Sequence, residues 1–408
     1  MLLPQKCFPK ILLFLIDCDI IKFTVEFLNK GSEKMIYLDN AATTKPCREA
    51  VQAAMEAMTE NYGNPSSLHR VGLNAQLSVD EARKMIAESI GAAPETIYFT
   101  SGATESNNLA IRGAAAANGK KRRKIVASSV EHHSVDETLT DLEEKGFTVV
   151  RVSPREDGRF YAEDFVNACD DDTVLLTMMY VNNETGYILP VKETFAAVKR
   201  RFKNIITHTD CVQAYMKLPV RVNPLGADLI SLSGHKVHAV KGVGALYVKK
   251  GVRLLPIITG GNQEKGVRSG TESVPLICAF GAAVRKLSPT VSSRFDIVSG
   301  LKMRLTELVS DIEGVEINSP EDGSPYVVNI SQSKRSEIML HYLESREIYV
   351  SSGSACSKGQ QSGVLGQFGI IGKRADGALR ISMTADTTEA ELEAFAEALR
   401  EGIATVRG

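Results

Sequence analysis

Short apolar runs alternate with amphipathic stretches over most of the chain between residues 46 and 294. Seven of these runs have the length of buried strands, and helical stretches separate most of them. They cover residues 96–100, 124–130, 147–152, 173–180, 205–210, 228–233 and 245–250. Strands that alternate with helices indicate βαβ units, so the pattern predicts an α/β fold with a mostly parallel seven-stranded sheet flanked by helices on both faces.

Two amphipathic helices are predicted ahead of the first strand. The first, within residues 46–61, carries apolar residues on one face: Val51, Ala54, Met55 and Met58. The second repeats apolar residues at helical spacing: Ala82, Met85, Ile86 and Ile90. Gly91 is placed to end this second helix, because glycine adopts the left-handed conformation of a helix C-terminus at little cost.

The alternation of strands and helices changes to a different pattern near residue 295. Residues 296–346 are predicted as helix, strand, strand and helix, followed by a stretch of small residues, the strand LRISM (379–383) and a last helix. That helix begins with the capping-box spacing of Thr388 and Glu391. It presents a buried-type face: Leu392, Phe395, Leu399 and Ile403. We therefore predict a smaller α+β domain over 295–408, a large domain over 51–294, and a segment 35–50 that packs with the small domain.

Residues 1–34 differ from the rest of the chain. The apolar run ILLFLI (11–16) is too short to span a membrane, and the acidic residues Asp17 and Asp19 come right after it. The run lacks a small-residue cleavage site at its end, so a secretory signal is not predicted. Met35 opens MIYLDNAATT, which has the character of a domain start. We expect the native chain to begin at Met35, with 1–34 as a leader outside the native fold.

The composition is that of an ordinary globular protein, with 43% hydrophobic and 24% charged residues among 408. A net charge of −1 argues against a nucleic-acid or membrane-surface partner. The seven cysteines are scattered, without a CxxC pair or the spacing of a metal site. Such a pattern predicts free thiols in a reducing compartment, here the cytoplasm.

Polar residues whose side chains can bind a ligand or take part in catalysis come after several of the predicted strands. The segments are TSGATE, SSVEHHS, YVNNETG, HTDCVQ and SLSGHK. In open parallel sheets, ligands bind at the carboxyl ends of the strands. The sequence therefore predicts one site that is assembled from these segments.

Each candidate residue also has a purely structural interpretation. Lys236 could be a surface charge, or an amine in a desolvated cleft that forms a Schiff base. Asp210 could cap a helix, or pair with the ring nitrogen of pyridoxal phosphate. Thr104 could be an N-cap, or part of a phosphate-binding helix start. His132 and His133, as neighbours on a strand, would point to opposite faces, so one ring could stack on a flat ligand while a two-histidine metal site is not expected.

Ten short motifs occur in a fixed order between residues 35 and 408. They are YLDNAATT, GNPSSLH, TSGATESNN, the histidine after a strand, VNNETG, D-x-x-Q, SGHK, KGVGALYV, RSGTE and SGSAC. With them, the chain resembles the cysteine desulfurases of the NifS/IscS group, in the class-V aminotransferase family of pyridoxal-phosphate enzymes, which have the aspartate-aminotransferase-like fold type I. The resemblance implies removal of sulfur from L-cysteine, giving L-alanine and an enzyme persulfide for an unidentified protein acceptor in iron–sulfur cluster assembly or thiolation.

The resemblance also implies a role for individual residues. Lys236 would bond to the cofactor, His132 would stack on its ring and assist proton transfer, and Asp210 would pair with its ring nitrogen. Cys356 would be the nucleophile that takes the sulfur, and it could contact a transferred iron–sulfur cluster; no other metal is implied. Further cofactor contacts would come from Ala103, Thr104, Asn183, Gln213, Ser233, His235 and Thr271.

Three further positions resemble residues that bind substrate or cofactor in this family: Asn64, Asn183 and Arg380. The Arg380 guanidinium would be a fork for the substrate carboxylate. Thr271, in RSGTE, resembles a residue that reaches the phosphate from a second subunit, which implies a homodimer.

The chain departs from the family pattern in places, and alternatives stay open. Cys211 stands where many relatives have alanine, residues 238–240 replace Tyr-Gly-Pro, and the stretch after Cys356 is atypical. The alternatives are a selenocysteine lyase, another class-V aminotransferase-like enzyme, or a non-catalytic sulfur-carrier scaffold. A true aminotransferase has no need of a mobile thiol, and a scaffold has no need of Lys236, Asp210 and His132.

Overall fold

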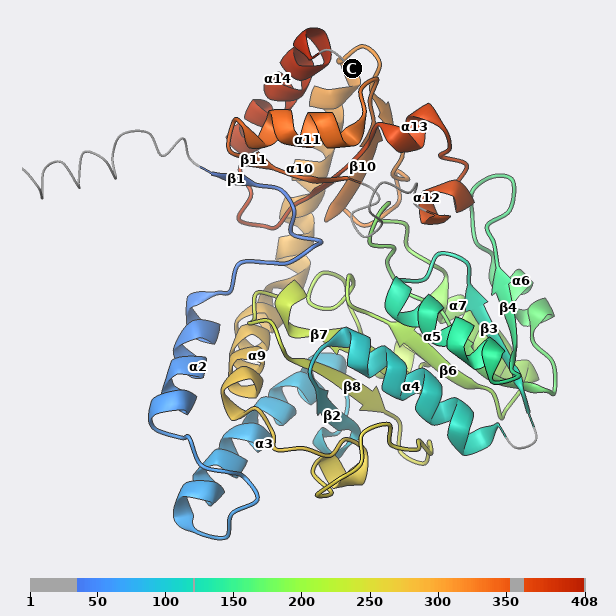
Figure 1. Ribbon diagram of the computed structural model, residues 1–408, viewed down its shortest axis with the longest axis vertical. Coiled ribbons are helices and arrows are strands. Elements are labelled where there is room, and N and C mark those ends of the chain that lie inside the picture. Colours follow the sequence, from blue (N-terminus) through green and yellow to red (C-terminus); the bar gives the residue numbers. More distant parts are fainter. Residues whose placement is uncertain (1–34, 120–121, 353–362, 407–408) are drawn as a thin grey trace, which may run out of the picture.

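The computed structural model describes residues 35–119, 122–352 and 363–406. The predicted leader and Cys356 lie outside these ranges. A seven-stranded sheet forms the centre of the larger part of the molecule, and a smaller sheet lies above it in Figure 1. The larger sheet has the order β2-β8-β7-β6-β5-β3-β4. Its strands are β2 (Ile97–Thr100), β3 (Lys124–Ser128), β4 (Thr148–Val152), β5 (Thr173–Thr177), β6 (Ile206–Asp210), β7 (Leu229–Ser233) and β8 (Gly244–Val248).

The sheet is mostly parallel, as predicted. Neighbouring pairs from β4 through β7 run parallel, whereas β8 is antiparallel to both β7 and β2. All seven predicted strands are present, but the predicted strands 124–130 and 173–180 end earlier, at Ser128 and Thr177. The residues after these ends, 129–132 and 178–180, lie outside the strands.

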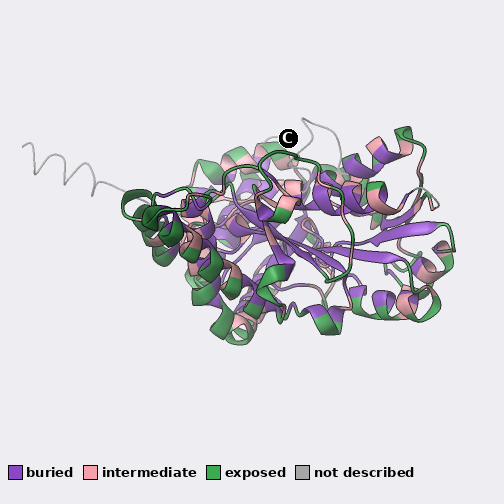
Figure 2. Ribbon diagram, turned by 90° about the horizontal axis from the view of Figure 1, so that it is seen from below, coloured by how far each residue is buried: buried purple, intermediate pink, exposed green. Residues whose placement is uncertain are grey.

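Helices cover both faces of the sheet, and the strand residues alternate between two cores. Val126 of β3 joins one core, and its neighbours Ile125 and Ala127 join the other. This period of two is the geometry of a strand that is buried on both sides. Figure 2 shows most strands in the buried colour, and β5, β6, β7 and β8 are buried at every position, whereas the edge strand β4 is only partly buried. The first core takes in α3 (Arg70–Ile90), α6 (Ala162–Ala168), α7 (Val191–Arg201) and α9 (Val274–Leu287), and the second takes in α4 (Ala103–Asn118) and α5 (His133–Glu144).

The first helix, α2 (Arg48–Thr59), does not bury the face that its larger apolar residues form. It packs against α9 through small residues: Ala50, Ala54 and Ala57. Val51, Met55 and Met58 are instead exposed. Alanines permit the close approach of two helices, so the bulkier side chains are left on the outside. The next helix, α3, ends as predicted at Gly91, whose φ is 69°.

The smaller sheet has the order β12-β13-β10-β9. Its strands are β9 (Glu316–Ile317), β10 (Val327–Ser331), β12 (Ser351–Ser352) and β13 (Ala378–Ser382), and the flanking helices are α10 (Val291–Ser310), α11 (Ser336–Glu344), α12 (Gly363–Gln367), α13 (Lys373–Asp376) and α14 (Glu389–Thr405). Helix α14 begins with the predicted capping box of Thr388 and Glu391. The N-terminal strand β1 (Ile36–Tyr37) pairs with β11 (Ile348–Tyr349), and Leu38 joins the core of this part.

Among the described residues, one helical run, Val274–Ser310, is long and apolar enough to cross a membrane by length and composition. Its first part is α9, whose buried side chains belong to the core between the sheet and helices α2 and α3. A helix that is apolar because it packs inside a globular core passes the same test of hydropathy.

Candidate active site

A cavity of about 650 Å³ lies at the carboxyl ends of the strands of the large sheet. It is lined by the turns after β2, β3, β5, β6 and β7, by residues 41–43, and by β13 of the smaller sheet. Its volume is in the range of small-molecule sites. Ten residues predicted for the site line it: Ala103, Thr104, His132, Asn183, Asp210, Gln213, Ser233, His235, Lys236 and Arg380.

Three predicted residues are not placed in this cavity. Asn64 is exposed in the segment between α2 and α3, where its Oδ1 accepts a hydrogen bond from the Ser66 amide at 3.0 Å. Thr271 is exposed in the long segment that precedes α9. Within this single chain neither residue lines the cavity, and Cys356 lies outside the described residues.

Lys236 reaches the cavity from a tight turn after β7. Strand β7 ends at Ser233, and Gly234–Lys236 form one turn of 3₁₀ helix. A Cβ at Gly234 would lie 2.9 Å from Val243 Cγ1, so only glycine fits this close passage. The Lys236 amine donates to the carbonyls of Ala41 and Ala42, at 2.5 and 2.7 Å. The turn therefore holds a primary amine at the edge of the sheet.

Asp210 ends β6 and is only 5% exposed. Its Oδ1 accepts from the Val212 amide at 2.9 Å, and its Oδ2 accepts from Asn107 Nδ2 at 2.7 Å. The first contact stabilises a local turn; it is not the helix cap of the structural alternative, because residues 212–217 form turns and no helix. The second orients the carboxylate, which also lines the cavity and can meet a ligand there.

His132 is the N-cap of α5, and the expectation that it lies on a strand is wrong. Strand β3 ends at Ser128, and the His132 Nδ1 accepts from the Ser134 amide at 3.1 Å. The rings of His132 and His133 make an edge-to-face contact, with 6.2 Å between their centroids. Burial lowers the pKa of His132, although Asp210 opposes this shift. His132 is thus a largely neutral imidazole on the wall of the cavity.

The start of α4 and the end of β7 form a cup of hydrogen-bond donors. The N-cap of α4 is Gly102, so Thr104 is not the N-cap but an exposed residue of the first turn. Ser233 contributes a buried hydroxyl that has no partner among the described residues. Burial beside Lys236 lowers the pKa of His235 to about 4, so its ring is neutral. Helix-start amides and spare hydroxyls are the donor set that suits a phosphate.

Arg380, on β13, brings the smaller sheet into the site. Its guanidinium donates to Asp39 Oδ1 at 2.9 Å and to the Asn183 carbonyl at 3.1 Å. Its Nε is buried without a partner among the described residues. The arginine is therefore held in place by two contacts and keeps capacity for a carboxylate ligand.

Several residues that sequence reasoning missed support this site. Asn107 contacts Asp210, and Ser134 contacts His132. Asn107 could have been noticed because it lies in the TSGATESNN motif, three residues after Thr104. Lys217 is buried and donates to Oε1 of Gln213, four residues earlier in the chain, at 2.8 Å. Burial, reinforced by nearby Lys236 and Arg380 and by Arg294, lowers the pKa of Lys217 to about 7.

The departures from the family pattern near this site leave its lining intact. Cys211 is fully buried, and burial raises the pKa of its thiol far above the usual range. His238 has a φ of 58°, and its ring donates from Nδ1 to the Lys45 carbonyl at 3.0 Å. Neither residue lines the cavity. A thiol and an imidazole of this kind contribute to packing.

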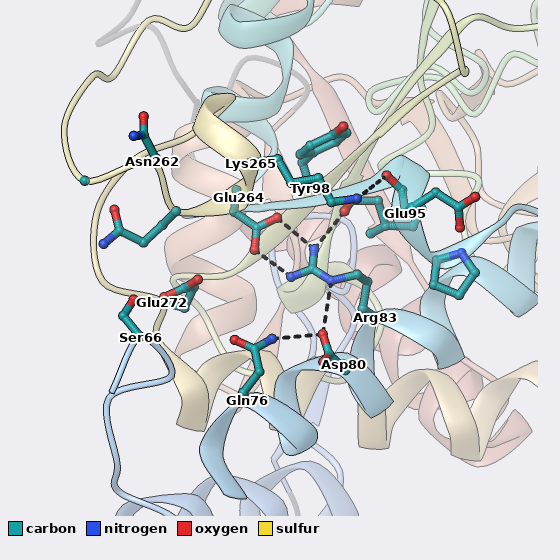
Figure 3. A pocket seen from close by; sticks show the side chains of 14 residues that line it. Ser66, Gln76, Asp80, Arg83, Glu95, Tyr98, Asn262, Glu264, Lys265 and Glu272 are labelled. Atoms are coloured by element: carbon teal, nitrogen blue, oxygen red, sulfur yellow. Dashed lines mark hydrogen bonds and ion pairs between the residues drawn. The ribbon is translucent and has the colours of Figure 1, made fainter. Parts of the chain in front are cut away.

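A second cavity, of about 540 Å³, lies against the segment that leads to Thr271 (Figure 3). Arg83 of α3 forms a two-pronged ion pair with Glu264, at 2.7 Å for both contacts. The Glu264 carboxylate also accepts from the Phe99 amide at 3.0 Å. Asn262, Glu264 and Lys265 all have positive φ, so this segment is held in an unusual conformation. These contacts tie it firmly to α3 and β2.

The first cavity defines the class of protein: an α/β fold that brings an amine, a carboxylate and an imidazole together with donors that suit a phosphate, all at its strand ends. The chain belongs to the aminotransferase class-V family, which matches residues 36–395. It is 38% identical over 378 residues to a "Cysteine desulfurase IscS" of Methanosarcina thermophila, covering 92% of this chain and 93% of that protein.

Solved structures show the same likeness. A "NifS-like protein" superposes with a TM-score of 0.86 and 34% identity, covering 91% of this chain and all of that one. A structure described as "SspA in complex with cysteine" superposes with a TM-score of 0.77 and 31% identity, covering 86% of this chain and 99% of that one. The predicted family and fold class are confirmed.

Proposed function

We propose that this protein is a cysteine desulfurase, which takes sulfur from L-cysteine with bound pyridoxal 5′-phosphate and leaves L-alanine and a persulfide on Cys356. The observation that carries the proposal is one cavity that contains the Lys236 amine, the Asp210 carboxylate and the His132 imidazole. Family membership and a relative named cysteine desulfurase support it, as does a similar structure that holds cysteine.

The donor set of the cavity fits pyridoxal phosphate. Lys236 would bond to the cofactor aldehyde, Asp210 would pair with the ring nitrogen and His132 would stack on the ring. Gln213 would contact the phenolic oxygen: Lys217 engages its amide oxygen and the Ala41 carbonyl takes one of its N–H groups at 2.9 Å, which leaves the second N–H for this contact. The phosphate would be held by the Ala103 amide, Thr104, Ser233 and His235, and the unpartnered Ser233 hydroxyl supports this assignment.

When bound, pyridoxal phosphate supplies an electron sink that stabilises negative charge at the substrate Cα. Arg380 and Asn183 would bind and orient the substrate carboxylate. Lys236 Nζ would take the proton from Cα, and Asp210 would keep a proton on the cofactor's ring nitrogen. The Cys356 thiolate would then attack the substrate sulfur: an S–S bond forms, the Cβ–S bond breaks, and the carbon fragment keeps the electron pair and takes up a proton at Cβ, which becomes the methyl group of alanine.

The persulfide would pass to a protein acceptor in iron–sulfur cluster assembly or thiolation. We further propose a cytoplasmic location. The described cysteines support it, because Cys47, Cys169, Cys211 and Cys278 are free thiols, as expected in a reducing compartment.

The decisive experiment on this function replaces Cys356 with serine. We expect Cys356→Ser to lower alanine formation from L-cysteine at least about 100-fold, because a hydroxyl cannot accept sulfur as the thiolate does. Alanine, sulfide and thiol-specific labelling of the persulfide are measured with a reductant present. The matched control is Cys278→Ser, a half-buried thiol on α9 away from the cavity, which should keep the parent rate.

Alanine formation at the parent rate in Cys356→Ser would refute the desulfurase assignment. A keto acid in place of alanine would identify an aminotransferase. A kcat/KM that is far higher for L-selenocysteine than for L-cysteine would identify a selenocysteine lyase.

We also propose that the protein is a homodimer. Exposed hydrophobic residues succeed one another along α2, α3 and the segment between them: Val51, Met55, Met58, Tyr62, Leu68, Val71, Leu73 and Leu77. Apolar patches of this kind are typical of subunit interfaces. Thr271 lies outside its own chain's cavity, on a segment tied to α3, which is compatible with delivery to a second subunit.

The dimer proposal predicts a specific response to a charge on α2. Sedimentation should give about twice the mass of one chain, and Met55→Asp should shift the protein to monomers and weaken cofactor retention, because burying an unpaired carboxylate in an interface is costly. The control, Met303→Asp, alters a similarly exposed methionine on α10 and should leave the dimer intact. A parent protein that is monomeric at micromolar concentration would contradict the proposal.

A further inference from the structure

A chain of hydrogen bonds connects Asp210 with His132 behind the wall of the cavity. Asn107 Nδ2 lies 2.7 Å from Asp210 Oδ2 and 2.9 Å from Ser134 Oγ. Ser134 Oγ lies 2.9 Å from His132 Nδ1. Asn107, Ser134 and Asp210 are all buried. The end of β6, the second turn of α4 and the first turn of α5 thus meet through three polar contacts.

The identity of each atom gives this chain a direction. A carboxylate oxygen accepts hydrogen bonds, so the Asn107 atom that faces Asp210 is its NH₂ group. The two hydrogens of that group are directed to Asp210 and Ser134, and Ser134 Oγ is therefore the acceptor in its contact with Asn107. The hydroxyl hydrogen of Ser134 is then free for His132 Nδ1.

A second contact requires the same state of the imidazole. The Ser134 backbone amide donates to His132 Nδ1 at 3.1 Å, and an amide N–H needs an acceptor lone pair. A nitrogen that accepts from both an amide and a hydroxyl carries no proton of its own. In the neutral ring the proton is then on Nε2, the other nitrogen, while the ring lines the cavity.

The contacts with Asp210 and Ser134 decide which way the side-chain amide of Asn107 is turned. Its Oδ1 is buried and has no partner among the described residues. An unsatisfied buried carbonyl destabilises the fold. Turning the amide over would place this oxygen against the Asp210 carboxylate, where two acceptors would meet without a hydrogen between them.

We propose that Asn107 and Ser134 are positioning residues, which hold neutral His132 with its proton on Nε2 and so present an N–H donor to the ligand cavity. The charged and titratable groups around His132 are Asp210 from β6, Lys236 from the turn after β7, and its neighbour His133. Burial keeps the ring largely neutral against the opposing effect of Asp210. The tautomer therefore decides whether His132 offers a donor or a lone pair to a substrate atom.

The assignment of a tautomer concerns the protein itself, and only its effect on catalysis rests on the proposed function. The test is ¹⁵N NMR of the imidazole nitrogens in histidine-labelled holoenzyme, because protonated and unprotonated ring nitrogens have well-separated shifts. Loss of signals in His132→Gln assigns the ring. The compared proteins are the parent, Ser134→Ala and the matched control Ser129→Ala, whose hydroxyl is also buried but has no partner among the described residues.

We expect the parent to show a proton on Nε2 and a lone pair on Nδ1. Ser134→Ala should shift the tautomer ratio about threefold to tenfold toward Nδ1–H, the effect of one net hydrogen bond. Asn107→Leu should shift it in the same direction, Ser134→Thr should restore the parent spectrum, and Ser129→Ala should leave it unchanged. The value of kcat/KM for L-cysteine should fall about tenfold in Ser134→Ala.

A parent spectrum with the proton on Nδ1 overturns the proposal whatever the variants do. Equal spectra for Ser134→Ala and Ser129→Ala also overturn it. Should Ser134→Ala not fold, Asn107→Leu and the parent spectrum give the same decision. If alanine is not formed from L-cysteine by the parent protein, the proposed function fails, whereas the tautomer remains measurable.

Discussion

Lys236→Ala is expected to lower alanine formation from L-cysteine at least about 10⁴-fold, the largest effect of any single change that the site predicts. The Lys236 amine lies at the strand-end cavity, held by the Ala41 and Ala42 carbonyls. Without it, the cavity loses both the group that bonds to the cofactor aldehyde and the base for the Cα proton. Borohydride reduction and then peptide mass spectrometry should find cofactor on the peptide of residue 236 in the parent, and none on that peptide in the variant.

Lys241 offers a matched control for this experiment, since it is a second lysine that lines the same cavity. Lys241→Ala should retain the borohydride-reducible bond and most of the activity. A reducible bond that persists at full yield in Lys236→Ala would show that another amine carries the cofactor.

Asp210→Asn is expected to lower alanine formation about 100- to 1,000-fold, because an amide does not hold a proton on the cofactor ring nitrogen as a carboxylate does. The side chain is almost the same size, and its one oxygen can still accept from Val212 N; the contact with Asn107 is kept if the Asn107 amide turns over, because its NH₂ group would otherwise face the new NH₂ group. We therefore expect the loss in kcat and in the absorbance spectrum of the bound cofactor, with little change in the unfolding temperature.

The control for this substitution is Asp136→Asn, which removes a carboxylate that pairs with Arg151 at 2.8 Å outside the cavity. It should leave kcat unchanged. Near-parent activity in Asp210→Asn, with the cofactor bound and the protein folded, would contradict the role of the carboxylate.

The sequence alone predicts the elements of this fold well, because their signals are local. A strand buried on both sides appears as a short apolar run, and a helix end is marked by a cap such as Thr388 or a left-handed glycine such as Gly91. The resemblance to known motifs then identifies the class of enzyme and ten residues that do line one cavity. The roles of these residues, and the domain limits, stay predictions.

Local patterns fail where the outcome depends on a distant partner. Helix α2 turns its alanines inward because α9 lies close against it, and α9 begins more than 200 residues later in the chain. From the sequence, His132 is expected on a strand. In the structure it is the N-cap of α5, and its ring accepts a hydrogen bond from the Ser134 amide. No periodicity distinguishes a methionine that faces the core from one that faces solvent or a second subunit.

By itself the sequence determined the alternation of strands and helices, the motifs at the strand ends, and through them the family of this protein. Only the tertiary structure decided which side chains of those motifs touch. Asn107 meets Asp210 across 103 residues of sequence and Ser134 across 27, and such pairs form only when α4, α5 and β6 pack at one edge of the sheet. Hydrogen-bond direction, and with it the proton position on His132, results from that packing because the Asp210 carboxylate can only accept and the Ser134 amide can only donate.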